Sequence, residues 1–534
     1  MSSPDRFLER ILRRDVTIGV DPDKAFTDIE GKGLYGGVPF LDDRAVFPEI
    51  RALDSFEGFY KANQYLVELD FYFFAAQPLW LAAKTLIQEE WNLDMENVTL
   101  FAHDWLGVPL FWAMKLDDTF KQARTVYFAH ETRICRLIVE GVIKGGQEKK
   151  AIEKQCSPDG HDASFYAYLQ ELEKPQREKD DLEQAFPGCK RFDGIFYHVL
   201  NRQAEHFDRI VAVGKNVRRE TELILRGLRK SPPISLCPNG IPDFTAPLES
   251  VAEAKKRLVA FCNYHFGYEP TYIFTSVNRC ELSKAPWRNV EFYRAFVEQH
   301  KNDDCPSLFI WLARPRPLPT AEEVRRWQDW GWPKEHRSKQ KGGDLRGEEE
   351  ALWGRIQDVN RQFPKKHQIL YVNQFGWSGE KLGALDPKDT EFRDLRVGTD
   401  VELGLSVYEP FGIAPLEPFS SGAVCVLSDA CGCACHLSEL QGKNLKSDEG
   451  KNLKFDECFV IGRFTQHSAP PERVNLDLLR TIEAQCYGDM IKELDQKLRV
   501  DRKARWAAAQ GAMKFLSWEA VVEHYLLPEL RPLA

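Results

Sequence analysis

Short apolar runs recur along most of the chain, and polar or helix-patterned segments separate them. They lie at 98–102, 125–129 and 208–213 in the first half, and at 272–277, 308–312 and 368–372 in the second. Runs of this length are typical of buried strands, and segments such as 216–227 between them carry a helical pattern. Strands that alternate with helices predict parallel sheets built from βα units. We therefore expect an α/β protein.

The stretch 405–429 combines apolar and acidic positions in an order that predicts a ligand-binding loop. Glu409 and Glu417 lie eight residues apart, with two prolines and Gly412 between them, and the apolar run 423–427 follows. This pattern predicts a strand end, a bent loop, a helix start and a next strand. In open α/β sheets ligands bind at the carboxyl ends of strands, and N–H groups at a helix start attract anions. We expect the loop to lie in such a crevice.

Polar side chains follow three of the predicted strands directly. His103 comes after 98–102 and His130 after 125–129, so two parallel strands would point their histidines into one crevice; the alternative is that either histidine is an ordinary loop residue. Arg279 and Lys284 follow 272–277, and such a cationic pair suits an anionic ligand, most often phosphate. Glutamates repel phosphate but accept hydrogen bonds from hydroxyl groups. A ligand with a diphosphate and many hydroxyls is a sugar nucleotide.

Length and composition narrow the class of protein. The 534 residues are too many for one core and predict two large domains, and 43% hydrophobic with 29% charged residues is typical of a soluble globular chain. A net charge of −9 argues against a nucleic-acid-binding protein. No apolar run approaches the roughly 20 residues of a membrane span, and the charged N-terminus lacks a signal-peptide core. Thirteen cysteines, most of them placed singly, favour reduced thiols in the cytoplasm.

Two further segments invite a functional interpretation. Cys431, Cys433, Cys435 and His436 suggest zinc, but structural zinc sites draw ligands from two separate segments with wider spacing, so we expect no metal here. Residues 313–367 are predicted to form a polar insertion between two strands. Its Arg325-Arg326 pair is predicted to lie on a solvated helix face, and contact with a regulatory anion is the alternative.

Several of these motifs resemble those of one enzyme family. YEPFGIAPLE at 408–417 resembles the E-x7-E motif of retaining GT-B glycosyltransferases, and RCELSK at 279–284 resembles their diphosphate-binding loop. FAHDW at 101–105 is similar to the His-Asp-Trp segment of glycogen and starch synthases, and CPNGI at 237–241 to the segment at their domain junction. FLSW at 515–518 is similar to the helix that crosses back to their first domain. The order and spacing of these motifs make coincidence a poor explanation.

The resemblance implies a GT-B fold, with two Rossmann-like domains facing a central cleft. Residues 1–245 would form the acceptor-side domain, 246–505 the nucleotide-sugar donor domain, and 506–534 a helix crossing back to the first. The donor would be UDP-glucose, ADP-glucose or another sugar nucleotide, the acceptor an α-glucan, and no metal or other cofactor would be needed because basic residues neutralise the diphosphate. The implied roles are Arg279 and Lys284 on the diphosphate, Glu409 as the catalytic carboxylate at the donor sugar, the backbone of Phe411, Gly412 and Ile413 on sugar and phosphate, Glu417 on the ribose, and His103 as a catalytic group facing the reacting sugar from the other domain.

One part of the family pattern is missing. Ahead of His103 the family has a strand followed by a glycine-rich loop, and we find no such unit, so we expect the N-terminal domain to lack its first βα unit. Three hypotheses remain open: a transferase that extends an α-glucan, a transferase of the same fold with a small sugar or lipid acceptor, and a diverged protein that binds glucan or sugar nucleotide without turnover. The sequence does not indicate the oligomeric state.

Overall fold

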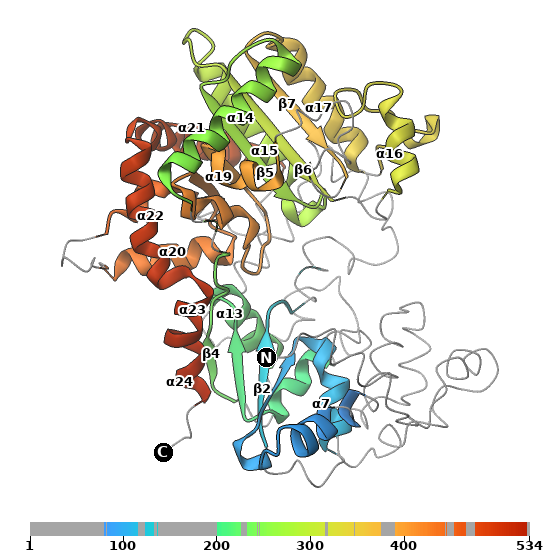
Figure 1. Ribbon diagram of the computed structural model, residues 1–534, viewed down its shortest axis with the longest axis vertical. Helices are drawn as coiled ribbons and strands as arrows, with labels where there is room; N and C mark the ends of the chain where they lie inside the picture. Colours follow the sequence, from blue (N-terminus) through green and yellow to red (C-terminus); the bar gives the residue numbers. More distant parts are fainter. Residues whose placement is uncertain are drawn as a thin grey trace. The chain divides into compact units, whose positions relative to one another are not determined.

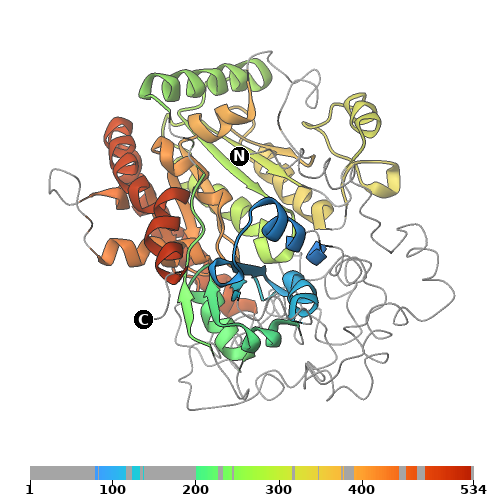
Figure 2. The same ribbon diagram turned by 60° about the horizontal axis from the view of Figure 1, so that its bottom comes forward.

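The structure is a computed structural model, drawn as ribbons in Figures 1 and 2. Residues 1–78, in which the sequence shows no strand with a glycine-rich loop, lie outside the described part of the chain, so that expectation stays a prediction. The described residues are 79–81, 83–115, 123–132, 136, 200–225, 232–314 except 243 and 245, 319–374 except 347, 377, 390–443, 445, 453–465 and 476–530.

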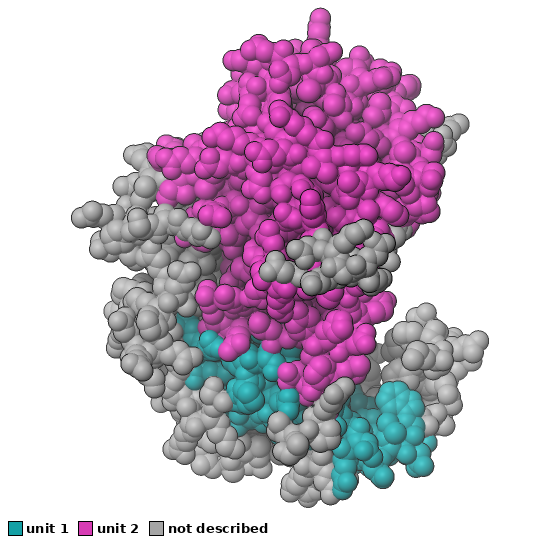
Figure 3. Space-filling model, turned by 90° about the vertical axis from the view of Figure 1, so that its left-hand side faces the viewer, with its two compact units in different colours: residues 1–134, 180–212, 220–235 teal, residues 135–179, 213–219, 236–534 magenta. Residues whose placement is uncertain are grey.

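The chain divides into two compact units (Figure 3). Unit 1 comprises residues 1–134, 180–212 and 220–235, and unit 2 comprises 135–179, 213–219 and 236–534. Each unit is described by itself below. The domain boundaries expected from the resemblance, at 245 and 505, stay a prediction.

Unit 1 is built on a four-stranded sheet in the order β1-β2-β3-β4. Its strands β1, β2 and β3 pair in parallel, as the alternating pattern predicts. Phe111 of α7 stacks on Phe207 with ring centroids 3.8 Å apart, so α7 packs against the residues just before β3. The elements are β1 (Thr99–His103), α7 (Val108–Lys115), β2 (Arg124–Ala129), β3 (Arg209–Ala212), α13 (Lys215–Ile224, shared with unit 2) and β4 (Ile234–Leu236).

Unit 2 contains a six-stranded sheet in the order β10-β9-β8-β5-β6-β7, with parallel pairing throughout. The order reverses at β5, because β6 and β7 extend the sheet on one side of it and β8, β9 and β10 on the other. In open parallel sheets ligands bind at the carboxyl ends of the strands where the order reverses, which here is the region between β5 and β8. The strands are β5 (Tyr272–Asn278), β6 (Ser307–Ala313), β7 (His367–Val372), β8 (Val401–Gly404), β9 (Val424–Ser428) and β10 (Phe459–Gly462).

Helices cover both faces of this sheet. Along β6 the side chains of Phe309 and Trp311 pack into one hydrophobic cluster and those of Leu308 and Ile310 into another, as the alternation of a strand requires. The first cluster includes residues of α15, α17 and α21, and the second includes residues of α14, which lies across the sheet in Figures 1 and 2. The helices are α14 (Leu248–Phe266), α15 (Pro286–Gln299), α16 (Ala321–Gln328), α17 (Glu348–Gln362), α19 (Phe392–Gly398), η12 (Ala414–Ser421), α20 (Gly432–Gly442), α21 (Leu476–Arg499), α22 (Arg502–Leu516), α23 (Trp518–Val521) and α24 (Leu527–Leu530).

Most of the sequence expectations about the fold agree with the structure. The two parallel sheets confirm the α/β class, and each of the six predicted strands is a strand within a residue or two. Within the described ranges no helix combines the length and the apolar character needed to cross a bilayer.

The insertion at 313–367 is less polar than expected. Arg325 and Arg326 lie exposed on α16, as predicted, but Trp327 and Trp332 are 1% and 2% exposed and belong to the core on the α14 side of the sheet. Trp332 Nε1 also donates to Asn373 Oδ1 at 2.9 Å, at the end of β7. The sequence does not show that these tryptophans are buried, because basic residues surround them. The part of the insertion that contains them packs against the core of unit 2.

Candidate functional site

A cavity of about 550 Å³ opens in unit 2 at the carboxyl ends of β5, β6 and β8. Its position is the point at which the strand order reverses, which is the expected place for a ligand in this architecture. The volume lies within the range of about 300–1,000 Å³ typical of small-molecule sites. The cavity is lined by Val277, Asn278, Arg279, Lys284, Leu312, Ala313, Arg314, Gln374, Trp377, Phe392, Gly404, Ser406, Glu409, Gly412, Ile413, Ala414 and Pro415.

The backbone brings the basic loop after β5 and the acidic loop after β8 together. The carbonyl oxygen of Ser283 accepts hydrogen bonds from the N–H groups of Val407 and Tyr408, each at 3.0 Å. On the other side of the acidic loop, the N–H of Gly432 donates to the carbonyl of Glu409 at 3.0 Å. The loop is therefore held between the residues that follow β5 and the start of α20.

Lys284 and Glu409, which both line the cavity, form a direct ion pair between Nζ and Oε2. Their side chains are only 9% and 15% exposed. The resemblance assigns Lys284 to the diphosphate and Glu409 to the donor sugar, and the structure puts the two side chains in direct contact. An ammonium group has three donors, so Lys284 can keep Glu409 and still bind an anion.

Positive charge dominates the cavity lining. Arg279, Lys284 and Arg314 are cationic, and Glu409 is the one acidic residue among the described lining residues. Arg279 also forms an ion pair with Glu281 at 3.3 Å, which keeps its guanidinium near the loop. An anionic ligand would find a net attractive field in this cavity.

Gly412 gives the acidic loop its bend. Its φ of +92° lies in the region that favours glycine, and a Cβ atom there would lie 2.8 Å from Cγ of Glu409. A side chain at this position would strain the backbone and displace the carboxylate. The bend and the position of Glu409 thus depend on the same glycine.

Three of the predicted site residues are not among those that line this cavity, namely Phe411 and Glu417 in unit 2 and His103 in unit 1. Phe411 is buried, and its carbonyl accepts a hydrogen bond from the N–H of Cys433 at 2.8 Å. Glu417 lies on η12, 18% exposed, and forms an ion pair with Nε of Arg396 at 3.1 Å. Burial raises the pKa of Glu417, and Arg396 opposes that rise. Phe411 is thus bonded to the start of α20, and Glu417 is paired with Arg396 on α19.

His103 lies in unit 1, at the end of β1, where it meets His130 at the end of β2. His103 Nδ1 and His130 Nε2 are 2.7 Å apart, and the rings stack with centroids 5.0 Å apart. Asp104 Oδ1 accepts from the N–H groups of His130 and Glu131, at 2.6 and 3.0 Å, and so holds the loop after β2. Burial, with His103 beside it, lowers the pKa of His130 to about 4. The expectation that the two strand-end histidines converge agrees with this geometry.

The structure adds cavity residues that the sequence reasoning missed. Arg314 directly follows β6 just as Arg279 directly follows β5, so the same strand-end rule would have found it. Trp377 and Phe392 gave no such signal, because neither directly follows a predicted strand.

The cysteine-rich segment begins α20. Cys431 and Cys433 are fully buried, and Cys431 Sγ contacts the carbonyl of Gly404 at 3.5 Å. Across the described ranges, no three histidine, cysteine or acidic side chains come together as metal ligands would.

Unit 2 is thus a doubly wound parallel α/β unit with an anion-attracting cavity at its switch point. No known family model matches the chain, and no curated protein sequence does. Similar solved structures include a UDP-forming α,α-trehalose-phosphate synthase from Burkholderia xenovorans in complex with glucose-6-phosphate, with 13% identity, TM-score 0.45, and coverage of 87% of this chain and 79% of that one. They also include the sucrose-phosphate synthase of Thermosynechococcus elongatus, with 14% identity, TM-score 0.41, and coverage of 86% and 77%. Likenesses at this level leave the function to be argued from the site itself.

Proposed function

We propose that the chain is a nucleotide-sugar-dependent glycosyltransferase of the GT-B type that moves glucose from a nucleotide-glucose donor to an α-glucan, with retention at the transferred sugar. The observation that carries the proposal is the cavity in which Arg279 and Lys284 face Glu409 at the switch point of a parallel sheet. The donor half of the proposal follows from this chemistry, and the acceptor and the retention follow from the motif resemblance.

The cavity offers each part of a sugar nucleotide a matching surface. Arg279, Lys284 and Arg314 suit the diphosphate, because charge-assisted hydrogen bonds to phosphate oxygens are strong. The carboxylate of Glu409 suits sugar hydroxyls, which it can bind as an acceptor. Trp377 and Phe392 form an apolar part that suits a flat nucleobase. A lone phosphate or a neutral sugar would use only one of these surfaces.

The contact between Lys284 and Glu409 shapes the proposed reaction. When the bond between the sugar and the diphosphate breaks, negative charge develops on the leaving oxygen, and Lys284 and Arg279 stabilise it from a partly water-excluded site. Glu409 keeps Lys284 in place before the donor arrives and accepts hydrogen bonds from the sugar afterwards. Removing a charge contact of this kind typically lowers the rate by about 10²–10³. Lys284 and Arg279 neutralise the diphosphate charge that a divalent metal would otherwise neutralise. EDTA should therefore leave the transfer rate unchanged.

The direct test is transfer from UDP-glucose and ADP-glucose to glycogen, with glucose-6-phosphate as a small acceptor in a parallel arm. Lys284→Met should lower turnover about 10²-fold or more. Lys366→Met is the matched control, since Lys366 is 49% exposed and pairs with Asp304 at 3.0 Å, outside the cavity lining. Equal turnover in the two variants would contradict the assigned role of Lys284.

The arms separate the open hypotheses. Transfer to glycogen supports the α-glucan proposal, and transfer to glucose-6-phosphate alone supports a small acceptor. Calorimetric binding of either donor without turnover identifies a non-catalytic binding protein. Absence of donor binding overturns the proposed function. His103→Ala tests the role that the resemblance gives His103, and it should lower turnover while donor binding to unit 2 persists.

A further inference from the structure

Tyr371, near the end of β7, is a fully buried tyrosine whose hydroxyl and carbonyl are both bonded to the insertion at 313–367. The hydroxyl donates to Glu349 Oε1 at 2.8 Å, and the carbonyl accepts from the ring Nε2 of His336 at 2.9 Å. His336 is fixed in turn, because its Nδ1 bonds to Oδ2 of Asp344. All four side chains are buried. Since a buried polar group without a partner is costly, this network keeps the hydroxyl of Tyr371 in one direction.

The hydroxyl of Tyr371 also reaches the basic loop after β5. It is a hydrogen-bond partner of the thiol of Cys280, which directly follows Arg279. Because the hydroxyl proton is directed at Glu349, the hydroxyl oxygen accepts from the thiol. Burial raises the pKa of Glu349 to about 7, so at pH 8 this carboxylate is ionised and acts as an acceptor. The contacts therefore run from the insertion through Tyr371 to the residue beside Arg279.

The two ends of the basic loop are held by different elements. At its far end, Ser283 is bonded to the acidic loop. At its near end, Oδ1 of Asn278, a residue of the cavity lining, accepts from Trp311 Nε1 at 2.9 Å. The ring of Trp311 meets that of Tyr371 edge-on, with centroids 5.5 Å apart. Tyr371 thus contacts both the residue after Arg279 and the tryptophan that holds the residue before it.

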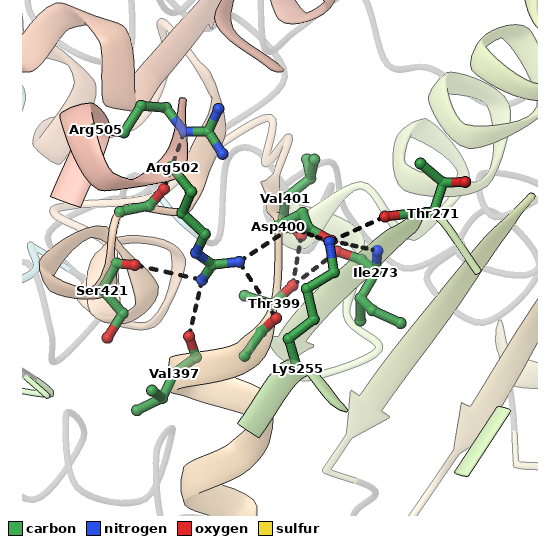
Figure 4. A network of polar contacts seen from close by, with 12 residues as sticks. Lys255, Thr271, Ile273, Val397, Thr399, Asp400, Val401, Ser421, Arg502 and Arg505 are labelled. Atoms are coloured by element: carbon green, nitrogen blue, oxygen red, sulfur yellow. Dashed lines mark hydrogen bonds and ion pairs between the residues drawn. The ribbon is translucent and has the colours of Figure 1, made fainter. Parts of the chain in front are cut away.

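The start of β5 is held by a separate network (Figure 4). Asp400 accepts from the N–H of Ile273 at 2.9 Å. Lys255 and Arg502 bind the same carboxylate, at 2.9 and 3.0 Å. Arg502, on α22, also donates to the carbonyl of Ser421 at 3.3 Å, so α22 anchors the end of η12 as well. Removal of one hydroxyl near the carboxyl end of the sheet should therefore leave β5 in place and change the basic loop.

We propose that Tyr371 is a positioning residue that, through Cys280, keeps the guanidinium of Arg279 directed at the anionic group of the bound ligand. This inference rests on the proposed function, which identifies that group as the diphosphate of a nucleotide. Tyr371 is not among the described residues that line the cavity, so it acts on the ligand only through the basic loop. The insertion supports anion binding in the same way, because it fixes the hydroxyl of Tyr371.

Calorimetry at pH 8 tests the inference with two pairs of ligands, UDP with uridine and ADP with adenosine. The wild-type protein should bind at least one diphosphate about tenfold or more tightly than its nucleoside, since charge-assisted hydrogen bonds to phosphate are strong. Tyr371→Phe keeps the ring and removes only the hydroxyl. In this variant the preference should fall at least about threefold, while nucleoside binding stays unchanged. A merely structural role would lower the thermal midpoint and leave the preference unchanged.

Tyr293→Phe is the matched control. Tyr293 is equally buried, and its hydroxyl bonds to Oγ of Ser307 at 2.9 Å, at the start of β6, whereas the cavity lies at the carboxyl end of that strand. This variant should keep the full preference for the diphosphate.

Cys280→Ala is the second variant, since Cys280 is only partly buried and its replacement disturbs the core less. It should lower the preference as Tyr371→Phe does. The double variant should show no further fall, because both changes remove the same contact, and additive effects would overturn the role of Cys280. If Tyr371→Phe does not fold, Cys280→Ala decides: a threefold fall supports the inference, and an unchanged preference overturns it.

The possible failures are distinguishable. If the wild-type protein binds neither diphosphate, the proposed function falls and the inference with it. If it binds each diphosphate no more tightly than the nucleoside, the anion-binding role of Arg279 falls. If the wild-type preference exists and Tyr371→Phe keeps it, only the role of Tyr371 is overturned.

Discussion

The contact between Lys284 and Glu409 can be measured without any substrate. The perturbation is a double-mutant cycle with Lys284→Met, Glu409→Gln and the double variant. Each single change removes one charge from a pair whose side chains are 9% and 15% exposed. The double variant removes both charges and leaves no unpaired one. Its loss of unfolding free energy should therefore be smaller than the sum of the losses in the two single variants.

The expected magnitude follows from the geometry. Two unit charges about 4 Å apart attract each other by ~4 kcal/mol at an effective dielectric constant of ~20. Desolvation of two largely buried charges offsets much of this, so we expect a coupling energy of about 1–3 kcal/mol. Each single variant should lower the free energy of unfolding by ~1–3 kcal/mol, less than the ~3–5 kcal/mol of a fully buried pair, because the cavity admits water.

The assay is urea unfolding of the four proteins at low salt, followed by tryptophan fluorescence. A coupling energy below about 0.5 kcal/mol would refute the reasoning, since residues that do not interact give additive effects within that margin. High salt should change the result little, because partly buried pairs are screened less than surface pairs.

Three further predictions concern single residues. Gly412→Ala should lower turnover more than it lowers the thermal midpoint, since a Cβ would lie 2.8 Å from Cγ of Glu409 and displace the carboxylate; equal transfer rates in the two proteins would contradict this. The ring of His130 should stay neutral between about pH 5.5 and 8, since its pKa is lowered to about 4, and an NMR titration midpoint above about 6 would be inconsistent with the buried ring pair. Burial raises the pKa of Glu349 from 4.5 to about 7, so the folded state holds this proton more tightly than the unfolded state. The free energy of unfolding should therefore fall as pH rises across that interval, by at most about 3 kcal/mol, and urea midpoints at pH 5 and 8 should converge in Glu349→Gln.

The sequence predicts the sheets well because their strands are buried on both faces. Runs such as 308–312 are apolar at every position, so they stand out from the polar segments around them. The strand-end rule also places Arg279 and Lys284 at the cavity, since parallel strands present their carboxyl ends at one edge. β8 was harder to find, because its run Val401–Gly404 contains the buried Glu402 and reads as half polar.

Contacts between residues far apart in the sequence could not be predicted from the sequence alone. Glu402 looks like a surface residue in the sequence, and only its partners Arg396 and Thr275 explain why it is buried. The Pro-Asn-Gly segment at 238–240 reads as a tight turn, yet Gly240 is needed for another reason. A Cβ there would lie 2.5 Å from Cα of Trp518, so the glycine allows two distant segments to touch.

The anchoring of η12 by α22 also orders events in time. Arg505 Nε donates to the carbonyl of Gly422 at 3.1 Å and Gln510 Nε2 to that of Ser420 at 2.6 Å, so the turn that carries Glu417 is completed by residues more than 80 positions later. A ribosome adds about 5–20 residues per second, and the turn must therefore wait roughly 4–17 s after its own synthesis for these partners. Since η12 contributes Ala414 and Pro415 to the cavity lining, we expect the cavity to be completed only after α22 has emerged.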